Sequence, residues 1–487
     1  MGGKLLTSIR YWIIVVITIA AITSCSQERR SERKHGKHDG KTNLDLVLQR
    51  GKLIALTDYN SVNYYIYRGE PMGYQYEMLK AFTDELGIRL DIRINDNLNH
   101  SFEMLNEGRV DLIALGLTVT RDRQRQYDFT DPIMITRQML VQRLPENWRS
   151  MATRDEIENN LLRSSLDIAG KTIHVQMGSV FKKRLETLAD EIGDTIHIIE
   201  DKREVEELIT AVSNGEIDYT VADEHIALVN ARYHSNIDVR TPLSFPQRLA
   251  WALRKEENDE LRQEINRWLN DFSNTLTARL IHNKYFTSSR TARMARSEFH
   301  SLTGGRVSMY DEIIHEVAEE IEWDWRLLAS LIYQESEFRP DAVSWAGAFG
   351  LMQFMPVVME QFGIDTTASP EEQIRVGGAF IRYLDRQIPS SITHPEERIK
   401  FILASYNAGV GHVLDARRLA EKFNKNPDIW TDHVDFFMLN KSKPAFYRDP
   451  VVYYGYARGD ETFRFVNEIL ERYDHYRNLL PDKVVKQ

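Results

Sequence analysis

The stretch from Leu331 to Pro356, LIYQESEFRPDAVSWAGAFGLMQFMP, constrains the fold of this chain more than any other. Apolar side chains recur just before and within it at spacings of three and four residues, which predicts a helix with one apolar face: Leu327, Leu328, Leu331 and Ile332. Asp324 precedes them and suits an N-cap. Because Pro340 disfavours helical geometry at the residue before it, we expect the helix to end near Phe338. Glu335 then lies in the last turn, beside the apolar face.

The predicted position of Glu335 is unfavourable for a carboxylate. The C-terminus of a helix carries partial negative charge, which disfavours a second anion. Partial burial also disfavours the charged form of the side chain. Both effects raise the pKa, as a general acid working near neutral pH requires. The alternative is an ordinary surface glutamate at a helix end, like Glu337, and the pattern alone leaves both open.

Three ordered motifs resemble those of the lytic transglycosylase (SLT, lysozyme-like) family. The first is Glu335-Ser336-x-Phe338-x-Pro340-x-Ala342-x-Ser344 with Gly347-Ala348-x-Gly350-Leu351-Met352-Gln353-x-Met355-Pro356. The second is Ala404-Ser405-Tyr406-Asn407-Ala408-Gly409, and the third is Glu461-Thr462 with Phe465-Val466. The third departs from the family pattern, because Phe465 stands where the family has a tyrosine. The resemblance runs from about Ser308 to Tyr476.

The resemblance implies that residues 308–487 form a mainly α, lysozyme-like domain that cleaves peptidoglycan glycan strands. In the implied mechanism, Glu335 protonates the glycosidic oxygen between N-acetylmuramic acid and N-acetylglucosamine. It then takes a proton from the C6 hydroxyl of the muramoyl sugar, which closes on C1 and leaves a 1,6-anhydro product without water. The family pattern gives substrate-binding support to four more positions: Ser344, Gln353, Tyr406 and Asn407.

The number of carboxylates near Glu335 bears on the choice between lyase and hydrolase. Glycosidases usually use two carboxylates. Glu337 faces elsewhere on the helix, and Asp341 lies beyond the proline. We therefore expect a single functional carboxylate, with no metal and no cofactor. A lysozyme-type muramidase, which needs a productive water, stays open. The later aromatic residues fit both a core and a surface that stacks on sugars: Trp430, Phe436, Phe437, Tyr447, Tyr453, Tyr454 and Tyr456.

Composition sets wide bounds on the rest of the chain. Its 487 residues suffice for two or three domains. A net charge of −10 argues against a general nucleic-acid partner. The single cysteine, Cys25, excludes an intrachain disulfide and a cysteine-rich metal site.

The N-terminus has the pattern of an export signal over residues 1–24. Positive charges precede an apolar run, from Tyr11 to Ile22, that is short for a membrane span. The run ends at Ile22-Thr23-Ser24-Cys25, which resembles a bacterial lipobox. This implies lipidation of Cys25 and, with Ser26 after it, attachment to the periplasmic face of the outer membrane. An ordinary cleaved signal is the alternative. Residues 25–43 are polar and basic and read as a flexible tether.

Residues 44–272 alternate between strand and helix patterns, which predicts an α/β domain with a largely parallel sheet. Five segments resemble the periplasmic solute-binding proteins of family 3: Gly73-Tyr74-x-Tyr76-Glu77, Asp111-Leu112-Ile113-Ala114, Leu117-Thr118-Val119-Thr120-x-x-Arg123, Asp128-Phe129-Thr130-Asp131-Pro132 and Gly215-Glu216-Ile217-Asp218-x-x-Val221-Ala222-Asp223. The resemblance implies two lobes around a cleft. We expect the chain to cross between them near Leu140 and return near Ser235.

The same resemblance assigns ligand contacts in the cleft. Arg123 matches the arginine that grips a ligand carboxylate, for which a planar guanidinium is suited. Asp223 matches the acid that meets the ligand ammonium, while Thr118 and Ser179 take the positions of neutral donors. The alternative for Arg123 is a place in a solvated basic turn. A linker over residues 273–307, with a short helix from Leu276 to Tyr285, joins this domain to the α domain.

Three functions are compatible with this organisation. The first is a membrane-anchored lytic transglycosylase whose N-terminal domain senses a peptide or amino acid from the wall. The second is a hydrolase on the same α domain. The third is a non-enzymatic solute receptor that the α domain holds to the cell wall, against which the intact motif around Glu335 argues.

Overall fold

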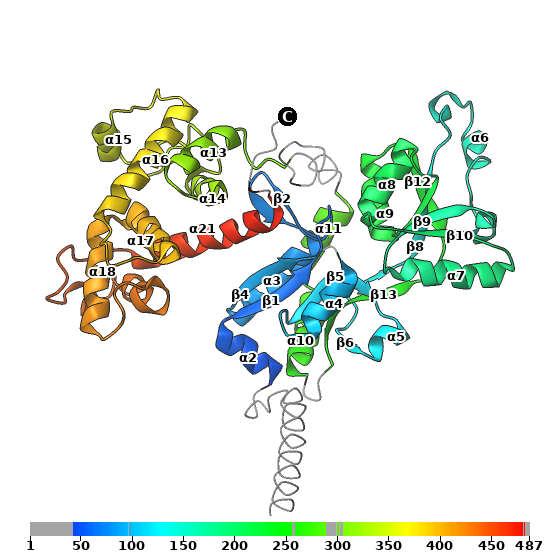
Figure 1. The fold of residues 1–487 in the computed structure, drawn as a ribbon, viewed down its shortest axis with the longest axis horizontal. Helices are drawn as coiled ribbons and strands as arrows, with labels where there is room; N and C mark the ends of the chain where they lie inside the picture. Colours follow the sequence, from blue (N-terminus) through cyan, green and yellow to red (C-terminus); the bar gives the residue numbers. More distant parts are fainter. Residues whose placement is uncertain are drawn as a thin grey trace, which may run out of the picture.

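The computed structural model describes residues 42–95, 97–255, 259–288, 299, 301, 305–480 and 482. The predicted export signal, Cys25 and nearly all of the tether lie outside these residues. Figure 1 shows three bodies in a row: a helical domain, a first α/β lobe at the centre and a second α/β lobe beyond it.

The first lobe is built on a six-stranded sheet with the order β4-β1-β5-β13-β6, in which β7 also pairs with β13. Its strands are β1 (Lys52–Thr57), β4 (Arg89–Ile94), β5 (Leu112–Thr118), β6 (Tyr127–Phe129), β7 (Met134–Thr136) and β13 (Gln247–Arg254). β1 pairs in parallel with both β4 and β5, which buries it and explains its apolar sequence. The helices are α2 (Asn43–Arg50), α3 (Tyr74–Leu86), α4 (Leu98–Asn106), α5 (Arg121–Gln124), α10 (Glu260–Phe272) and α11 (Leu276–Phe286). A small hairpin, β2 (Tyr65–Tyr67) and β3 (Glu70–Met72), projects from this lobe.

The second lobe has a five-stranded sheet with the order β10-β9-β11-β8-β12. Its strands are β8 (Gln138–Arg143), β9 (Thr172–Gln176), β10 (His197–Asp201), β11 (Tyr219–Asp223) and β12 (Ile237–Pro242). The helices are α6 (Arg154–Glu158), α7 (Val180–Ile192), α8 (Val205–Asn214) and α9 (Glu224–Tyr233), with short turns η1 (Trp148–Ser150) and η2 (Ser165–Ile168). The two-lobed α/β fold is therefore as predicted.

The two crossings between the lobes lie partly elsewhere than expected. β7 belongs to the first sheet and β8 to the second, so the first crossing is at Arg137, close to the expected place. The expected return near Ser235 is wrong. After α9 the chain first adds β12 as an antiparallel partner of β8, and it returns only between Pro242 and Gln247.

The helix α11, in the segment expected to link the domains, packs on the first lobe. The Tyr285 hydroxyl accepts a bond from the Gly73 backbone N–H at 2.8 Å and donates to the Glu77 carboxylate in α3. Lys284 forms an ion pair with the same carboxylate at 2.6 Å. The α/β domain thus includes this helix in its packing.

The remaining residues form the predicted mainly α domain. Its helices are α13 (Asp311–Glu320), α14 (Trp325–Ser336), α15 (Pro356–Phe362), α16 (Pro370–Gln387), α17 (Pro395–Ala408), α18 (Val410–Lys422), α19 (Asp435–Leu439), α20 (Pro444–Tyr447) and α21 (Gly459–Leu479), with a turn η3 (Trp430–Val434). The long helix α21 packs on both α14 and α17 and then continues to the first lobe (Figure 1).

The end of α21 joins the two domains. Tyr64 Oη and His475 Nδ1 lie 2.5 Å apart, and both side chains are buried. The Tyr476 hydroxyl donates to the Gly69 carbonyl at 2.7 Å, and the Asn478 amide donates to the Ile92 carbonyl at 2.9 Å. The β2–β3 hairpin is therefore fixed against the helical domain.

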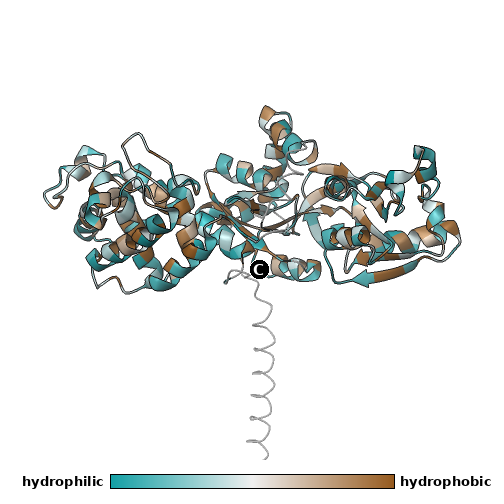
Figure 2. Cartoon of the chain, turned by 90° about the horizontal axis from the view of Figure 1, so that it is seen from above, coloured by the Kyte–Doolittle hydropathy of each residue, from teal (hydrophilic) through white to brown (hydrophobic). Residues whose placement is uncertain are grey.

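Hydrophilic and hydrophobic residues are interspersed along the helices. Figure 2 shows teal and brown segments alternating along the helices, as expected for helices with one buried face. Within the described part of the chain, no helix is both long enough and apolar enough to cross a bilayer.

Candidate active site and ligand-binding cleft

The helix α14 places Glu335 where the sequence predicts it. The Asp324 carboxylate accepts a bond from the Arg326 N–H at 2.9 Å, which confirms the N-cap. The helix ends at Ser336, two residues before the expected end, because Glu337 and Phe338 have left-handed backbone angles (φ 52° and 60°). Glu335 is in the last turn and half-buried.

The surroundings of Glu335 favour its protonated form. Burial raises the pKa of its carboxyl group to about 8. Among the residues that the structure describes, none forms an ion pair or a hydrogen bond with this carboxyl group. A raised pKa at this position is confirmed, and its cause is desolvation.

The loop after α14 is held by its own polar side chains. The Gln353 amide nitrogen donates to the Ala342 and Gly350 carbonyls at 3.0 and 2.9 Å, so only its amide oxygen stays available to a substrate. The Ser344 hydroxyl oxygen accepts from the Ala348 N–H at 2.9 Å, which leaves the hydroxyl hydrogen for another acceptor. Both residues therefore have a structural role in the loop, and their role in binding substrate stays a prediction.

The second and third motifs meet beside this loop. The Tyr406 hydroxyl donates to the Met352 carbonyl at 2.7 Å. Burial, with a smaller effect from the charge of Glu335, raises the pKa of Tyr406 well above its ordinary value. The Asn407 side-chain oxygen accepts from the Thr462 hydroxyl at 2.7 Å. Phe465, the departure from the family pattern, is buried. No hydrogen bond joins Ser344, Gln353 or Asn407 to Glu335 in the described part of the chain.

Sequence reasoning missed Gln373, a buried residue of α16 that supports the same loop. Its amide oxygen accepts from the Leu351 N–H at 2.7 Å, and its amide nitrogen donates to the Pro340 and Ala368 carbonyls at 3.3 and 3.0 Å. The sequence offers one sign of this role: Gln373 is a polar residue on the buried face of α16, together with Ile374, Ile381 and Leu384.

The seven later aromatic residues differ in exposure, and Tyr447 is intermediate. Trp430 and Phe437 are buried in the core. Four others are at least half exposed: Phe436, Tyr453, Tyr454 and Tyr456. The structure thus assigns Trp430 and Phe437 to the core and leaves the exposed rings accessible to a ligand.

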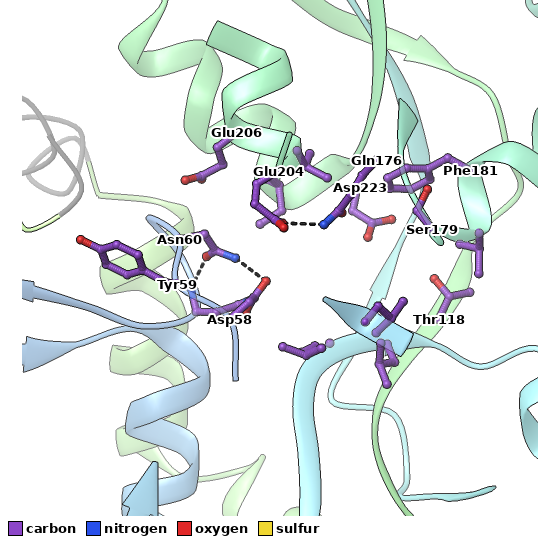
Figure 3. A pocket seen from close by; sticks show the side chains of 18 of the residues that line it. Asp58, Tyr59, Asn60, Thr118, Gln176, Ser179, Phe181, Glu204, Glu206 and Asp223 are labelled. Carbon is purple, nitrogen blue, oxygen red and sulfur yellow. Dashed lines mark hydrogen bonds between the residues drawn. The ribbon is translucent and has the colours of Figure 1, made fainter. Parts of the chain in front are cut away.

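In the α/β domain, all four residues expected to contact a ligand line one cleft. The cleft has a volume of about 530 Å³, and Thr118, Arg123, Ser179 and Asp223 are among its walls. Figure 3 shows Ser179 and Asp223 from the second lobe facing Thr118 from the first. The structure therefore brings these residues together as predicted.

The charges of Arg123 and Asp223 are set by burial. Burial lowers the pKa of Arg123 to about 10, and the Asp223 charge opposes this shift. Burial raises the pKa of Asp223 to about 7, and Arg123 opposes it. One Asp223 carboxyl oxygen and the Ser179 hydroxyl are buried, and neither has a hydrogen-bond partner among the residues that the structure describes. Arg123 donates to the Thr118 backbone carbonyl at 3.1 Å, so the Thr118 hydroxyl is not its partner.

Further acids in the cleft were not predicted. Asp58 accepts bonds from Asn60 and Asn63, both at 2.7 Å, and burial raises its pKa to about 7. Glu204 and Glu206 face it from the second lobe (Figure 3). Asp58 follows β1, and Glu204 and Glu206 lie at the start of α8. A sequence pattern gives no sign that acids so far apart in the chain will meet.

A metal site is not suggested by the described residues, which contain no group of three His, Cys, Asp or Glu side chains suited to a metal ion.

Two family models match the two domains. The model of bacterial extracellular solute-binding proteins, family 3, matches residues 52–288, and the transglycosylase SLT domain matches residues 312–429. The membrane-bound lytic murein transglycosylase F of Desulfosudis oleivorans is 35% identical over 88% of this chain and 90% of that protein. The chain belongs to this family.

A second member of the membrane-bound lytic murein transglycosylase F family, from Alteromonas mediterranea, is 30% identical over 95% of each chain. The similarity to the family therefore spans both domains. Among solved structures, a mutant arginine-binding protein from T. maritima is 19% identical and covers 51% of this chain and 100% of its own, with a TM-score of 0.43.

Proposed function

We propose that Glu335 is the general acid and base of a peptidoglycan lytic transglycosylase. The observation that carries this proposal is a half-buried carboxyl group with a pKa of about 8 in the first family motif. Such a group is protonated at neutral pH and can donate its proton to a leaving oxygen.

The reaction proceeds in two proton transfers at one residue. Glu335 protonates the oxygen of the β-1,4 bond between N-acetylmuramic acid and N-acetylglucosamine. As that bond breaks, the resulting carboxylate takes the proton of the muramoyl C6 hydroxyl, whose oxygen bonds to C1. The nucleophile belongs to the same sugar, so the attack benefits from proximity and a second carboxylate is unnecessary.

The other motif residues hold the substrate against Glu335. The Thr462 hydroxyl donates to the Asn407 amide oxygen and so orients this side chain. The Asn407 amide nitrogen is then left to donate to a sugar. Gln353 accepts through its amide oxygen, and Ser344 donates through its hydroxyl hydrogen. Tyr406 stays neutral and fixes the Met352 carbonyl beside the site.

Replacing Glu335 tests this assignment. The Glu335→Gln protein should lose about 10²- to 10⁴-fold in the release of soluble muropeptides, the usual contribution of a general acid-base group. Glu337→Gln is the matched control, because Glu337 is an exposed neighbour on the same chain segment. Equal rates for Glu335→Gln and the parent would remove Glu335 from catalysis.

The α/β domain binds a small ligand, for which we propose an amino acid or peptide released from the wall. Arg123 pairs with its carboxylate and Asp223 with its ammonium group, since both charges are buried and face one cleft. The additional acids Asp58, Glu204 and Glu206 favour a ligand with further positive charge.

Calorimetric titration of the Glu335→Gln protein with soluble wall peptides tests this binding. Removal of the guanidinium in Arg123→Met should weaken binding at least about tenfold, as expected for the loss of a charge-assisted bond. Exposed Arg121→Met on the same helix serves as control. Ligand bound equally by Arg123→Met and the parent would contradict the assigned contact.

The proposal extends to the organisation and location of the chain. Residues 44–272, with α11 packed on them, form the sensing domain. The rest of residues 273–307 joins it to the enzyme, which residues 308–487 form. A lipid on Cys25 holds the protein on the periplasmic face of the outer membrane, and the tether lets it reach the wall. Loss of the Cys25→Ser protein from the outer-membrane fraction is the expected result.

A further inference from the structure

A fully buried ion pair in the helical domain has no part in the mechanism above. Asp415 in α18 and Lys441, which follows α19, have side chains with 0% exposure, and Lys441 Nζ lies 2.6 Å from the Asp415 carboxylate. Burial raises the pKa of Asp415, but hydrogen bonds from Lys441 and from two backbone N–H groups bring it below its ordinary value. The pair is therefore charged, and a buried charged pair adds little stability over apolar packing.

The pair fixes one exposed segment, residues 451–456, which we call the tyrosine segment. The Asp415 carboxylate accepts from the backbone N–H groups of Tyr453 and Tyr454 at 2.8 and 2.9 Å. Lys441 donates to the Gly455 carbonyl at 2.8 Å. Arg418, which also binds Asp415, donates to the Val451 carbonyl at 2.8 Å. Charged side chains thus hold the backbone of this segment along its length.

The same segment presents three tyrosine rings to solvent. Tyr453, Tyr454 and Tyr456 are 74%, 62% and 56% exposed. Exposed rings of this size on neighbouring residues are typical of a ligand-binding surface.

Each of these rings is supported on one side. The Arg418 guanidinium lies 4.2 Å from the centre of the Tyr453 ring. The Tyr454 ring lies so close over Gly411 that a Cβ there would be 2.5 Å from it. The Tyr456 ring contacts the edge of Tyr447 at 5.8 Å between centres. The rings are therefore held in place before any ligand binds.

The tyrosine segment is continuous with the candidate active site. Gly411, under Tyr454, is four residues after Asn407. The chain that leaves the segment begins α21, whose Thr462 donates to the Asn407 side chain. The segment thus contacts the start of the helix that follows the second motif and directly precedes, in sequence, the helix that carries the third.

We propose that the tyrosine segment is a carbohydrate-binding subsite for a sugar of the glycan strand beyond the cleaved bond. Asp415 and Lys441 are its positioning residues. A pyranose ring has a flat C–H face that stacks on an aromatic ring, and its hydroxyls can bond to the phenol groups. This inference rests on the proposed function, because the sugar belongs to the strand that Glu335 cuts.

Kinetics on soluble uncrosslinked glycan strands test the subsite. A protein with Tyr453, Tyr454 and Tyr456 replaced by alanine should have a KM raised about tenfold and a nearly unchanged kcat, since the lost contact is made equally before and during reaction. In the Glu335→Gln background, the same replacements should weaken retention on insoluble peptidoglycan. Phe245→Ala, which removes an 86% exposed ring from the α/β domain, is the matched control and should change neither quantity.

The positioning role has its own test. Asp415→Asn should raise KM in the parent and add nothing further in the triple alanine protein, because it acts only through the tyrosines. Full addition of the two effects, or a lower melting temperature with an unchanged KM, would overturn the positioning role. If Asp415→Asn fails to fold, the kinetics of the triple alanine protein still test the subsite.

The outcomes separate this inference from the proposed function. A parent protein that releases 1,6-anhydro products while the triple alanine protein has the same KM and the same retention would overturn the subsite alone. A parent that releases no such products would overturn the proposed function itself. A raised KM with retained kcat supports both.

Discussion

At the scale of single residues, the proposed role of Glu335 as general acid makes activity depend on its protonation. Burial raises the pKa of Glu335 to about 8, so the acid form that starts the reaction is lost as pH rises through that value. Initial rates of muropeptide release should therefore be steady around neutral pH and decline above about pH 8. Rates that keep increasing from pH 8 to 10 would contradict a protonated Glu335.

The same pKa shift predicts a change in stability. The pKa of Glu335 is higher in the folded chain than its ordinary value of 4.5, so the folded chain holds this proton more tightly than the unfolded chain does. The resulting contribution to the free energy of unfolding is fully present below pH 4.5. This stability is lost as pH rises toward about 8, where a buried carboxylate remains. Glu335→Gln should therefore melt at a higher temperature than the parent at pH 9 and at a similar one at pH 4. Calorimetry at the two pH values checks this, and equal melting temperatures at pH 9 would contradict it.

Single residues also show what the sequence can and cannot reveal. The place of Glu335 and its raised pKa follow from the apolar stripe and Pro340, both of which are local. The hydrogen bonds from the Gln353 amide nitrogen to two loop carbonyls could not be predicted, because these partners depend on how the loop closes. Gln373 was missed for the same reason, since it reaches the loop from a separate helix.

At the scale of elements, the loop after α14 depends on one glycine. Gly350 has φ +84°, and a Cβ there would lie 2.3 Å from the Gln373 amide oxygen that binds Leu351. Gly350→Ala should destabilise the protein and displace the loop beside Glu335. Gly363 has a similar φ of +70° but no atom within 4 Å of its Cβ position, so Gly363→Ala carries the backbone strain alone.

The difference between the two variants measures the steric conflict. We expect Gly350→Ala to lose about 1–3 kcal/mol more than Gly363→Ala, the usual cost of overpacking. Urea unfolding of both proteins gives this difference. Equal losses would mean that Gln373 moves away freely and does not fix the loop.

Most elements could be predicted because their signals are local. The apolar pattern and Pro340 place the end of α14 within two residues, and the helix expected from Leu276 to Tyr285 matches α11 to within one residue. The return between the lobes was predicted too early, because β12 is defined by its pairing with β8, about 95 residues away.

At the scale of the whole molecule, the β2–β3 hairpin connects the two domains. A Cβ on Gly69 would lie 2.6 Å from Tyr333, 2.7 Å from the Tyr476 hydroxyl and 2.9 Å from Phe338. Gly69→Ala should therefore loosen the contact and increase the radius of gyration in small-angle scattering. Gly51→Ala is the control, with a φ of +68° and open space around its Cβ position. An unchanged radius in Gly69→Ala would mean that this contact does not hold the domains together.

This contact was beyond the reach of the sequence. Tyr64 and His475 are 411 residues apart and carry no motif, and their meeting depends on the direction in which α21 leaves the helical domain. The hairpin touches Tyr333 and Phe338, which lie on either side of Glu335 in sequence, so the α/β domain is in direct contact with the segment that carries this carboxyl group.

The lyase reaction is tested by the mass of the products that residues 26–487 release from purified peptidoglycan. We expect muropeptides that end in 1,6-anhydromuramic acid, about 18 Da lighter than the products of hydrolysis because no water is added. Products with reducing ends would contradict it and would require a second carboxylate that activates water.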